Sequence, residues 1–139
     1  MSGIIDLTTG TASAGNSGAI ALTTGVAEGG RGGAISVEVG KGNIGPGGAV
    51  LIGAGRTTAA ATGGRVTIWG GYGMETSSGA VSMMTMNAGV SGRSGDLAVR
   101  TGTTSFGNSG AVEIASGRAM QGRGGQIDLM AGTGGLGSG

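Results

Sequence analysis

The side chains that most often carry catalysis are scarce in this chain. Its 139 residues include no histidine and no cysteine, so the usual ligands of zinc, copper and haem are missing. A serine or threonine nucleophile also lacks its usual imidazole base. Three carboxylates, Asp6, Glu113 and Asp128, recur at one position of the repeat described below. We interpret them as solvated surface groups, and we expect neither enzyme activity nor a bound metal.

Two short stretches match nucleotide-binding signatures by their letters alone. Gly132–Gly137 has the spacing of a dinucleotide fingerprint, but no helical pattern follows it. In a chain with 37 glycines such a match arises by chance. Lys41 is the single lysine, and it lacks the sequence context of a phosphate-binding loop. The sequence therefore predicts no nucleotide cofactor and no cofactor of another kind.

The overall composition argues against several partners. Eight basic and seven acidic residues give a net charge of +1, whereas a nucleic-acid surface needs a basic stripe. No apolar run approaches the roughly 20 residues of a membrane span, and no signal peptide is visible at the start of the sequence. The lack of cysteine excludes a disulfide scaffold but leaves the compartment open.

A repeat organises the whole chain. The stretch small–Gly–x–φ–x–φ–x–x–Gly, with φ aliphatic or Met, is written nine times, most cleanly in residues 17–25. Successive copies start about 15 residues apart, and a nearly fixed period of this kind indicates a repeat architecture. The copies that begin at Gly47 and Ser78 are longer than the others by a single residue. The copies begin at Ser2, Ser17, Gly32, Gly47, Gly63, Ser78, Ser94, Ser109 and Gly124.

Within each copy, numbered from its first residue, apolar side chains occupy positions 4 and 6. Apolar residues two apart are typical of a strand with one buried face, and no stretch shows helical spacing. We therefore predict that these side chains form the core. Position 4 holds Ile5, Ile20, Ile35, Val50, Val66, Val81, Leu97, Val112 and Ile127, and position 6 holds Leu7, Leu22, Val37, Ile52, Ile68, Met83, Val99, Ile114 and Leu129.

These patterns predict an all-β fold, a single flattened parallel β-solenoid of nine coils over residues 1–139 with essentially no helix. One strand per copy cannot bury its own apolar face, so the copies stack at about 4.8 Å. Glycines at positions 2 and 9 serve as corners, with Met86 in place of the sixth position-9 glycine. Positions 10–14 form a second, shorter strand, in which position 13 adds the apolar fillers Ile44, Val90, Phe106 and Leu136.

The Ser-Gly-x-Val-x-Ile-x-x-Gly pattern resembles the 15-residue β-solenoid repeats of long surface proteins rich in Gly, Ser and Thr, which are predicted in algae and protists. The resemblance covers the whole chain. It implies a structural or adhesive role and carries no catalytic residues to transfer. It also implies a location outside the cell or at its surface.

We expect the chain to associate with itself. No atypical copy caps either end, so coil nine of one chain can stack on coil one of the next and build a filament. Asp6 and Asp128 would then meet as like charges, at a cost of about 0.2–1 kcal/mol. The exposed Trp69 and Met84 share position 7 and are candidates for a lateral contact between filaments.

Three alternatives stay open at this point. The missing caps also fit a fragment of a longer surface adhesin. Four threonine pairs suggest an ice-binding surface, namely Thr8-Thr9, Thr23-Thr24, Thr57-Thr58 and Thr103-Thr104. Glu38, Trp69 and Arg100 interrupt the row. A glycan-binding module would use Trp69 or Tyr72 as its aromatic contact.

Overall fold

The computed structural model describes residues 2–135. Within that range the chain has no helix and no sheet; it runs extended between bends, and Thr133 alone takes part in an isolated bridge. The prediction of essentially no helix agrees with this structure. The predicted nine-coil parallel β-solenoid, or β-helix, is wrong.

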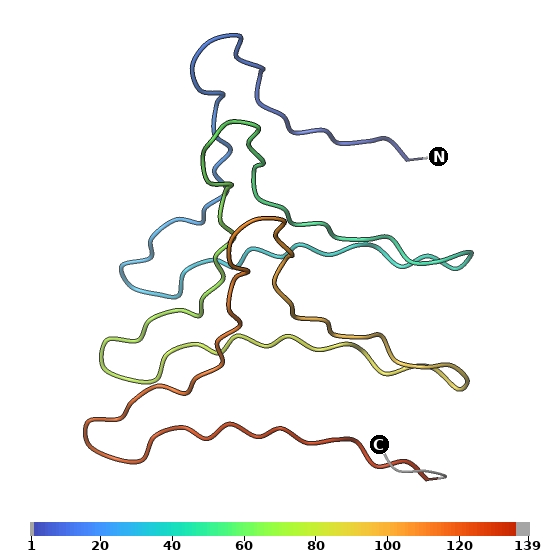
Figure 1. The fold of residues 1–139 in the computed structure, drawn as a ribbon, viewed down its shortest axis with the longest axis vertical. Helices are drawn as coiled ribbons and strands as arrows, with labels where there is room; N and C mark the ends of the chain where they lie inside the picture. Colours follow the sequence, from blue (N-terminus) through green and yellow to red (C-terminus); the bar gives the residue numbers. More distant parts are fainter. Residues whose placement is uncertain (1, 136–139) are drawn as a thin grey trace. The chain divides into compact units, whose positions relative to one another are not determined.

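The bends follow the sequence repeat closely (Figure 1). Each lies around positions 12–14 of a copy, and the extra residue of the two longer copies falls in or directly before the bends at 58–61 and 90–92. The periodicity therefore sets where the chain changes direction, even though no ladder forms. The bends lie at residues 13–15, 28–30, 43–46, 58–61, 74–76, 90–92, 105–107 and 120–122, and residue 135, the last described, is also in a bend.

At each bend the chain folds back on itself, so position 8 of one copy approaches position 2 of the next. We call the stretch between these two positions an arm, and its two ends the arm base. The five residues between consecutive arms, positions 3–7, are called a span, and they carry the apolar positions 4 and 6. The arms are residues 9–18, 24–33, 39–48, 54–64, 70–79, 85–95, 101–110 and 116–125.

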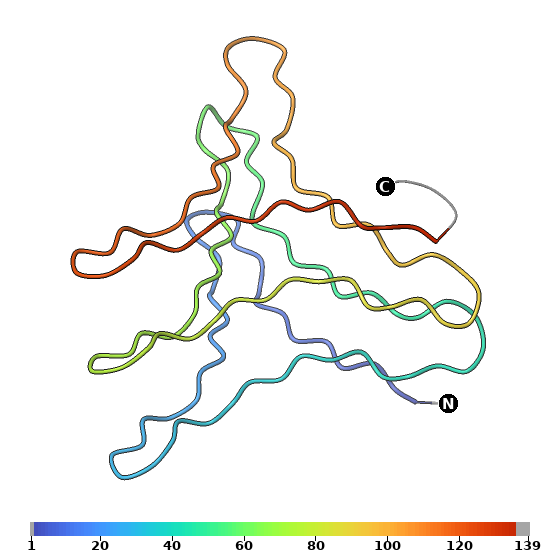
Figure 2. The same cartoon turned by 90° about the horizontal axis from the view of Figure 1, so that it is seen from below.

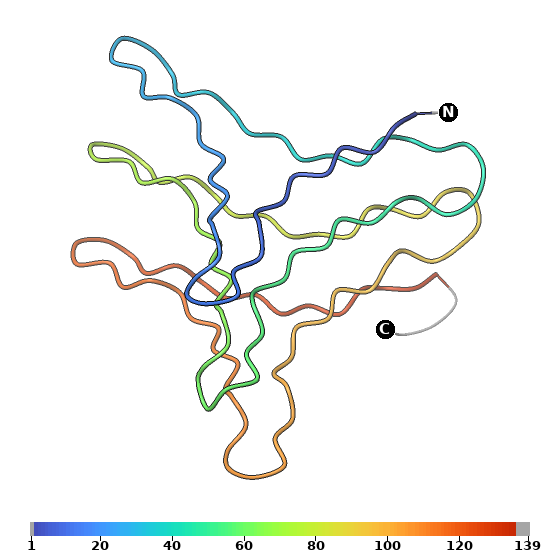
Figure 3. The ribbon, with the colours of Figure 1, turned by 90° about the horizontal axis from the view of Figure 1, so that it is seen from above.

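The chain divides into two compact units, Met1–Thr67 and Ile68–Gly139. In the first unit the arms 9–18 and 54–64 point the same way, while arms 24–33 and 39–48 point in two other directions (Figures 1 and 3). In the second unit arms 70–79 and 116–125 share a direction, with the two arms between them pointing elsewhere (Figures 1 and 2). Within each unit the chain therefore completes one turn in three copies.

This winding explains why the predicted stack does not form. Equal positions of consecutive copies lie on spans that run in different directions, and the same direction returns only after three copies. A parallel ladder needs its strands about 4.8 Å apart. In residues 2–135 the backbone hydrogen bonds instead join residues at most nine apart. The predicted corners at positions 2 and 9 and the predicted second strand at positions 10–14 are also wrong, because the chain folds back once per copy, around positions 12–14.

The described residues form no core of their own. No side chain in the described range is buried. The accessible surface of 14,513 Å² for a 13.0 kDa chain compares with about 6,300 Å² for a folded monomer of that mass and about 19,000 Å² for an extended chain. The predicted position-13 fillers Ile44, Val90 and Phe106 are exposed at bends, and Leu136 lies outside the described residues.

The glycines also play different parts from those predicted. Among residues 2–135 positive φ occurs in the bends, for example at Gly15 (86°) and Gly107 (100°), and not at positions 2 or 9. At position 2 the approach is close enough to favour glycine only in some copies: a Cβ built on Gly48 would lie 2.7 Å from a Cγ of Val39, whereas one built on Gly18 would make an ordinary contact of 3.4 Å with the Cβ of Thr9. The position-9 glycines have open space around their Cα atoms, which explains why Met86 is accepted there.

Candidate functional site

The described residues contain no site of a conventional kind. They form no cavity and bring no three metal-ligating side chains together. The carboxylate of Asp128 accepts a hydrogen bond of 2.6 Å from Nε2 of Gln126. The ion pair of Arg93 and Asp96, at 3.4 Å, is largely exposed, and pairs of this kind contribute little stability. Chemistry by a local cluster therefore has no support in this part of the chain.

Two further expectations from the sequence concern nucleotides and membranes. Residues 132–135 of the glycine run form no helix, and the remaining two residues of that motif lie outside the described range. Among residues 2–135 there is also no helix with the length and hydropathy to cross a membrane.

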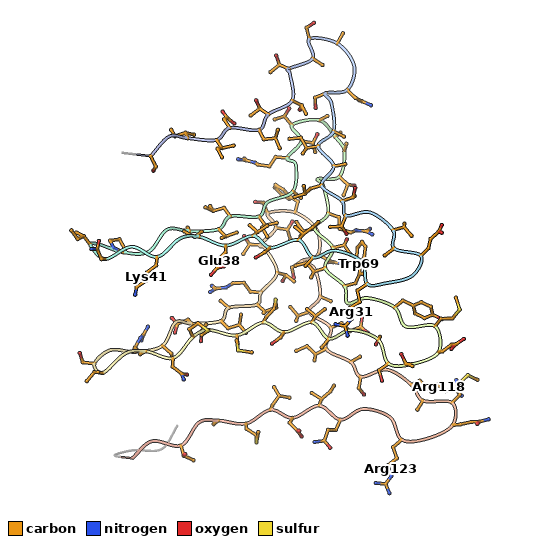
Figure 4. The ribbon with its side chains drawn as sticks, turned by 180° about the vertical axis from the view of Figure 1, so that it is seen from behind. Arg31, Glu38, Lys41, Trp69, Arg118 and Arg123 are labelled. Carbon is orange, nitrogen blue, oxygen red and sulfur yellow. The ribbon has the colours of Figure 1, made fainter. Side chains whose placement is uncertain are left out.

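Figure 4 shows Arg118 and Arg123 on either side of the bend at 120–122, with no acidic side chain paired to them in the described contacts.

Hydrogen bonds and close contacts join the two ends of the arms at their bases. The Gly64 N–H donates to the Gly55 carbonyl at 2.9 Å, and the Gly79 N–H donates to the Gly71 carbonyl at 2.8 Å. In the arm 24–33 the Thr24 hydroxyl instead donates to the carbonyl of Gly33 at 3.2 Å. Each arm is thus closed by the chain itself, through backbone or side-chain hydrogen bonds or through side-chain contact.

The residue at position 8 decides how an arm closes. Backbone hydrogen bonds cross the base where position 8 is Ala54 or Gly70. Where it is Thr or Val, its side chain lies against the position-2 glycine, as Val39 does at 2.7 Å from a Cβ built on Gly48. The sequence signal for this pairing was present, since position 2 is always Gly and position 8 is mostly small. The contact between the two positions was not among the sequence predictions.

We expect Gly70→Ala to weaken the arm 70–79, because its Cβ would collide with the carbonyl oxygen of Gly79. Relief of this collision separates the two ends of the arm. The hydrogen bond from the Gly79 N–H to the Gly71 carbonyl is then lost, and such a bond is worth about 1 kcal/mol. The midpoint of thermal unfolding should fall by about 2–4 °C, and amide exchange at Gly79 should speed up several-fold. Gly71→Ala is the matched control, because a Cβ on Gly71 meets nothing within 4 Å. Equal midpoints for the two variants would contradict the packing described.

The predicted core residues form two exposed rows along the spans. In the second to ninth copies the position-4 side chains are 46–62% exposed. Ile5, in the first copy, has no preceding copy beside it and is 98% exposed. The preceding copy therefore covers about half of each position-4 side chain. Position-6 side chains remain 62–85% exposed. The alternating pattern is present in the extended spans, but a single chain leaves most of this apolar area in water.

The two candidates for a lateral contact are also exposed. Trp69, labelled in Figure 4, is 77% exposed and Met84 is 73% exposed. They lie in consecutive spans of one unit, and no sheet in the described range aligns them. Their role as a lateral contact stays a prediction.

Several of the threonines considered for ice binding hydrogen-bond to the backbone. The Thr57 hydroxyl accepts from the Ala59 N–H at 3.2 Å, and the Thr104 hydroxyl donates to the Phe106 carbonyl at 2.9 Å. Thr9 and Thr24 lie at arm bases. In residues 2–135 no sheet presents these side chains as a flat row, so no observation favours an ice surface over the alternatives.

Comparison of the chain with protein-family models, with curated proteins and with solved structures gives no match. The resemblance to 15-residue repeats of surface proteins therefore stays a prediction.

Proposed function

We propose that this chain is a structural protein that associates with further copies of itself to build a filament or an adhesive fibre. The accessible surface carries the proposal. The chain exposes 14,513 Å², about 8,000 Å² more than a folded monomer of its mass. A standard interface covers only about 800 Å² per partner. Association must therefore be extensive enough to supply the core that the single chain lacks.

The spans offer two kinds of surface for such association. Their backbone N–H and C=O groups have no partners within the described residues apart from the bonds at the arm bases and bends. Buried backbone groups must be paired, and extended segments pair readily along their edges. Positions 4 and 6 add an apolar row on one face. Together these features support strand-to-strand addition.

A second copy of the same chain is the partner that fits these surfaces. The apolar pattern returns once in every copy of the repeat along the whole chain, so a partner must carry the same period to match it throughout. The net charge of +1 opposes neither self-association nor close packing. The function follows from assembly and requires no catalysis and no cofactor. An extracellular or cell-surface location is part of this proposal and rests on the resemblance of the repeat.

Electron microscopy and sedimentation of the purified chain across a concentration series test the proposal. We expect thin filaments whose diffraction shows a spacing of about 4.8 Å along the fibre axis. A chain that stays monomeric at the highest concentration, with an ordered extended structure, would overturn it. Faceted ice growth or saturable glycan binding by that monomer would favour the alternative functions instead.

A further inference from the structure

We infer that three copies of the chain intertwine around one axis, each displaced from the next by one copy of the repeat. This inference rests on the proposed self-association and specifies its geometry. Its basis is the winding of each unit, in which the arm direction returns after three copies. Neither the number of chains nor their register follows from self-association alone.

The number of chains comes from the symmetry of one turn. Each unit points successive arms in three directions before it repeats. Rotating a chain by one third of a turn about the winding axis therefore brings each copy of the repeat into the direction of the neighbouring copy in the sequence. Two further chains, added by this rotation, occupy the space between successive turns of the first. The three chains then use the same three arm directions, and no arm has to change shape.

The register follows from the same rotation. In any one direction, a copy of the first chain lies between the preceding copy of the second chain and the following copy of the third. Equal positions of consecutive copies thus become neighbours, but in different chains. Spans at the usual strand separation of about 4.8 Å require each chain to advance about 14 Å per turn. Backbone ladders then run from chain to chain along every span.

This arrangement places the apolar rows in one core. Position-4 side chains are half covered by the preceding copy of their own chain, and position-6 side chains are mostly exposed. Neighbouring chains stack further position-4 and position-6 side chains above and below them. The arms remain closed within each chain by the contacts between positions 8 and 2. Their bends point outward, which keeps the exposed tips out of the core.

The one-copy displacement also places two pairs of like charges next to each other in neighbouring chains. Lys41 meets Arg56 at position 10, and Glu113 meets Asp128 at position 5. All four side chains are exposed in the single chain, and salt screens repulsion between exposed charges. We therefore expect assembly to strengthen as the salt concentration rises from low to physiological.

Engineered cysteines test the register, because the native chain has none. Ser36 and Leu51 occupy position 5 of consecutive copies. Mixing Ser36→Cys chains with Leu51→Cys chains should give a disulfide between them, since neighbouring strands lie within disulfide range. Ser36→Cys chains alone should not cross-link to one another. Ser36→Cys mixed with Ser82→Cys is the matched control and should give no disulfide, because positions three copies apart are never neighbours in two different chains of this arrangement.

The mass of the unaltered protein tests the number of chains without any substitution. Chains with and without nitrogen-15 are unfolded together, refolded and measured by native mass spectrometry. The smallest assembly should have three times the 13.0 kDa chain mass and show four isotopic classes. Another number of classes overturns the three-chain arrangement. A disulfide between two Ser36→Cys chains, or an intramolecular disulfide in a Ser36→Cys, Leu51→Cys double variant, overturns the register. A protein that is only monomeric contradicts the proposed function itself.

Discussion

Replacing Val81 with aspartate should raise the concentration needed for half-assembly by about 100-fold or more. Val81 is at position 4 of the sixth copy and is 54% exposed in the single chain. Covering the remaining surface by other chains gains part of the roughly 1.5–3 kcal/mol that burial of a valine supplies. An aspartate loses this gain and adds the cost of burying a carboxylate with no partner. A free-energy difference of about 1.4 kcal/mol corresponds to a tenfold change in affinity.

Val90→Asp is the matched control for this substitution. Val90 lies at the bend 90–92 of the same copy and is fully exposed, so the same change of side chain there should leave assembly within about twofold of the unaltered protein. Sedimentation velocity over a concentration series measures both variants. If Val81→Asp assembles as readily as Val90→Asp, the position-4 row is not the surface that the chains share.

The sequence predicted the repeat of the chain but not where the chain bends. Corners were assigned to positions 2 and 9 and a second strand to positions 10–14, whereas the bends lie around positions 12–14 of each copy. The spacing of the copies set only the period at which the chain changes direction. It also identified extended spans with apolar residues at positions 4 and 6. These features depend on residues close together in the chain, where the preference of Gly for turns and of Val and Ile for extended backbone dominates.

The packing of the copies could not be derived in this way. A parallel stack within one chain and an open winding share the same local pattern, because both use extended spans separated by turns. The difference depends on contacts such as that of Thr9 with Gly18, which folds the arm back on itself. Such contacts join residues on both sides of a bend, and their geometry depends on the backbone angles in the bend, such as the positive φ of Gly15.

The candidate surface was predicted only in part. The residues at positions 4 and 6 were identified from their alternation, but they were assigned to a core within one chain. In the structure the same side chains, such as Ile68 and Val81, are exposed. A pattern of alternation shows that one face prefers to be buried. It does not show whether the covering chain is the same molecule or another one.

Dilution should unfold the protein as it dissociates. With no buried side chain and few backbone hydrogen bonds in the described range, the single chain cannot offset the conformational entropy of about 1–2 kcal/mol per ordered residue. Folding and assembly are then one transition, as in obligate oligomers, and the midpoint of thermal unfolding should rise with protein concentration. Circular dichroism and sedimentation should change together across the same dilution series.

The Val81→Asp chain provides the dissociated state at concentrations suited to X-ray scattering. We expect a radius of gyration of about 39 Å, as for an unfolded chain of this length, rather than the value of about 14 Å for a folded monomer. The Val90→Asp chain should scatter as the unaltered assembly does. A compact radius and an unchanged circular dichroism spectrum for dissociated Val81→Asp would show that the chain folds alone. In that case association would be secondary to a fold with its own core, and the exposed surface would no longer support assembly as the source of stability.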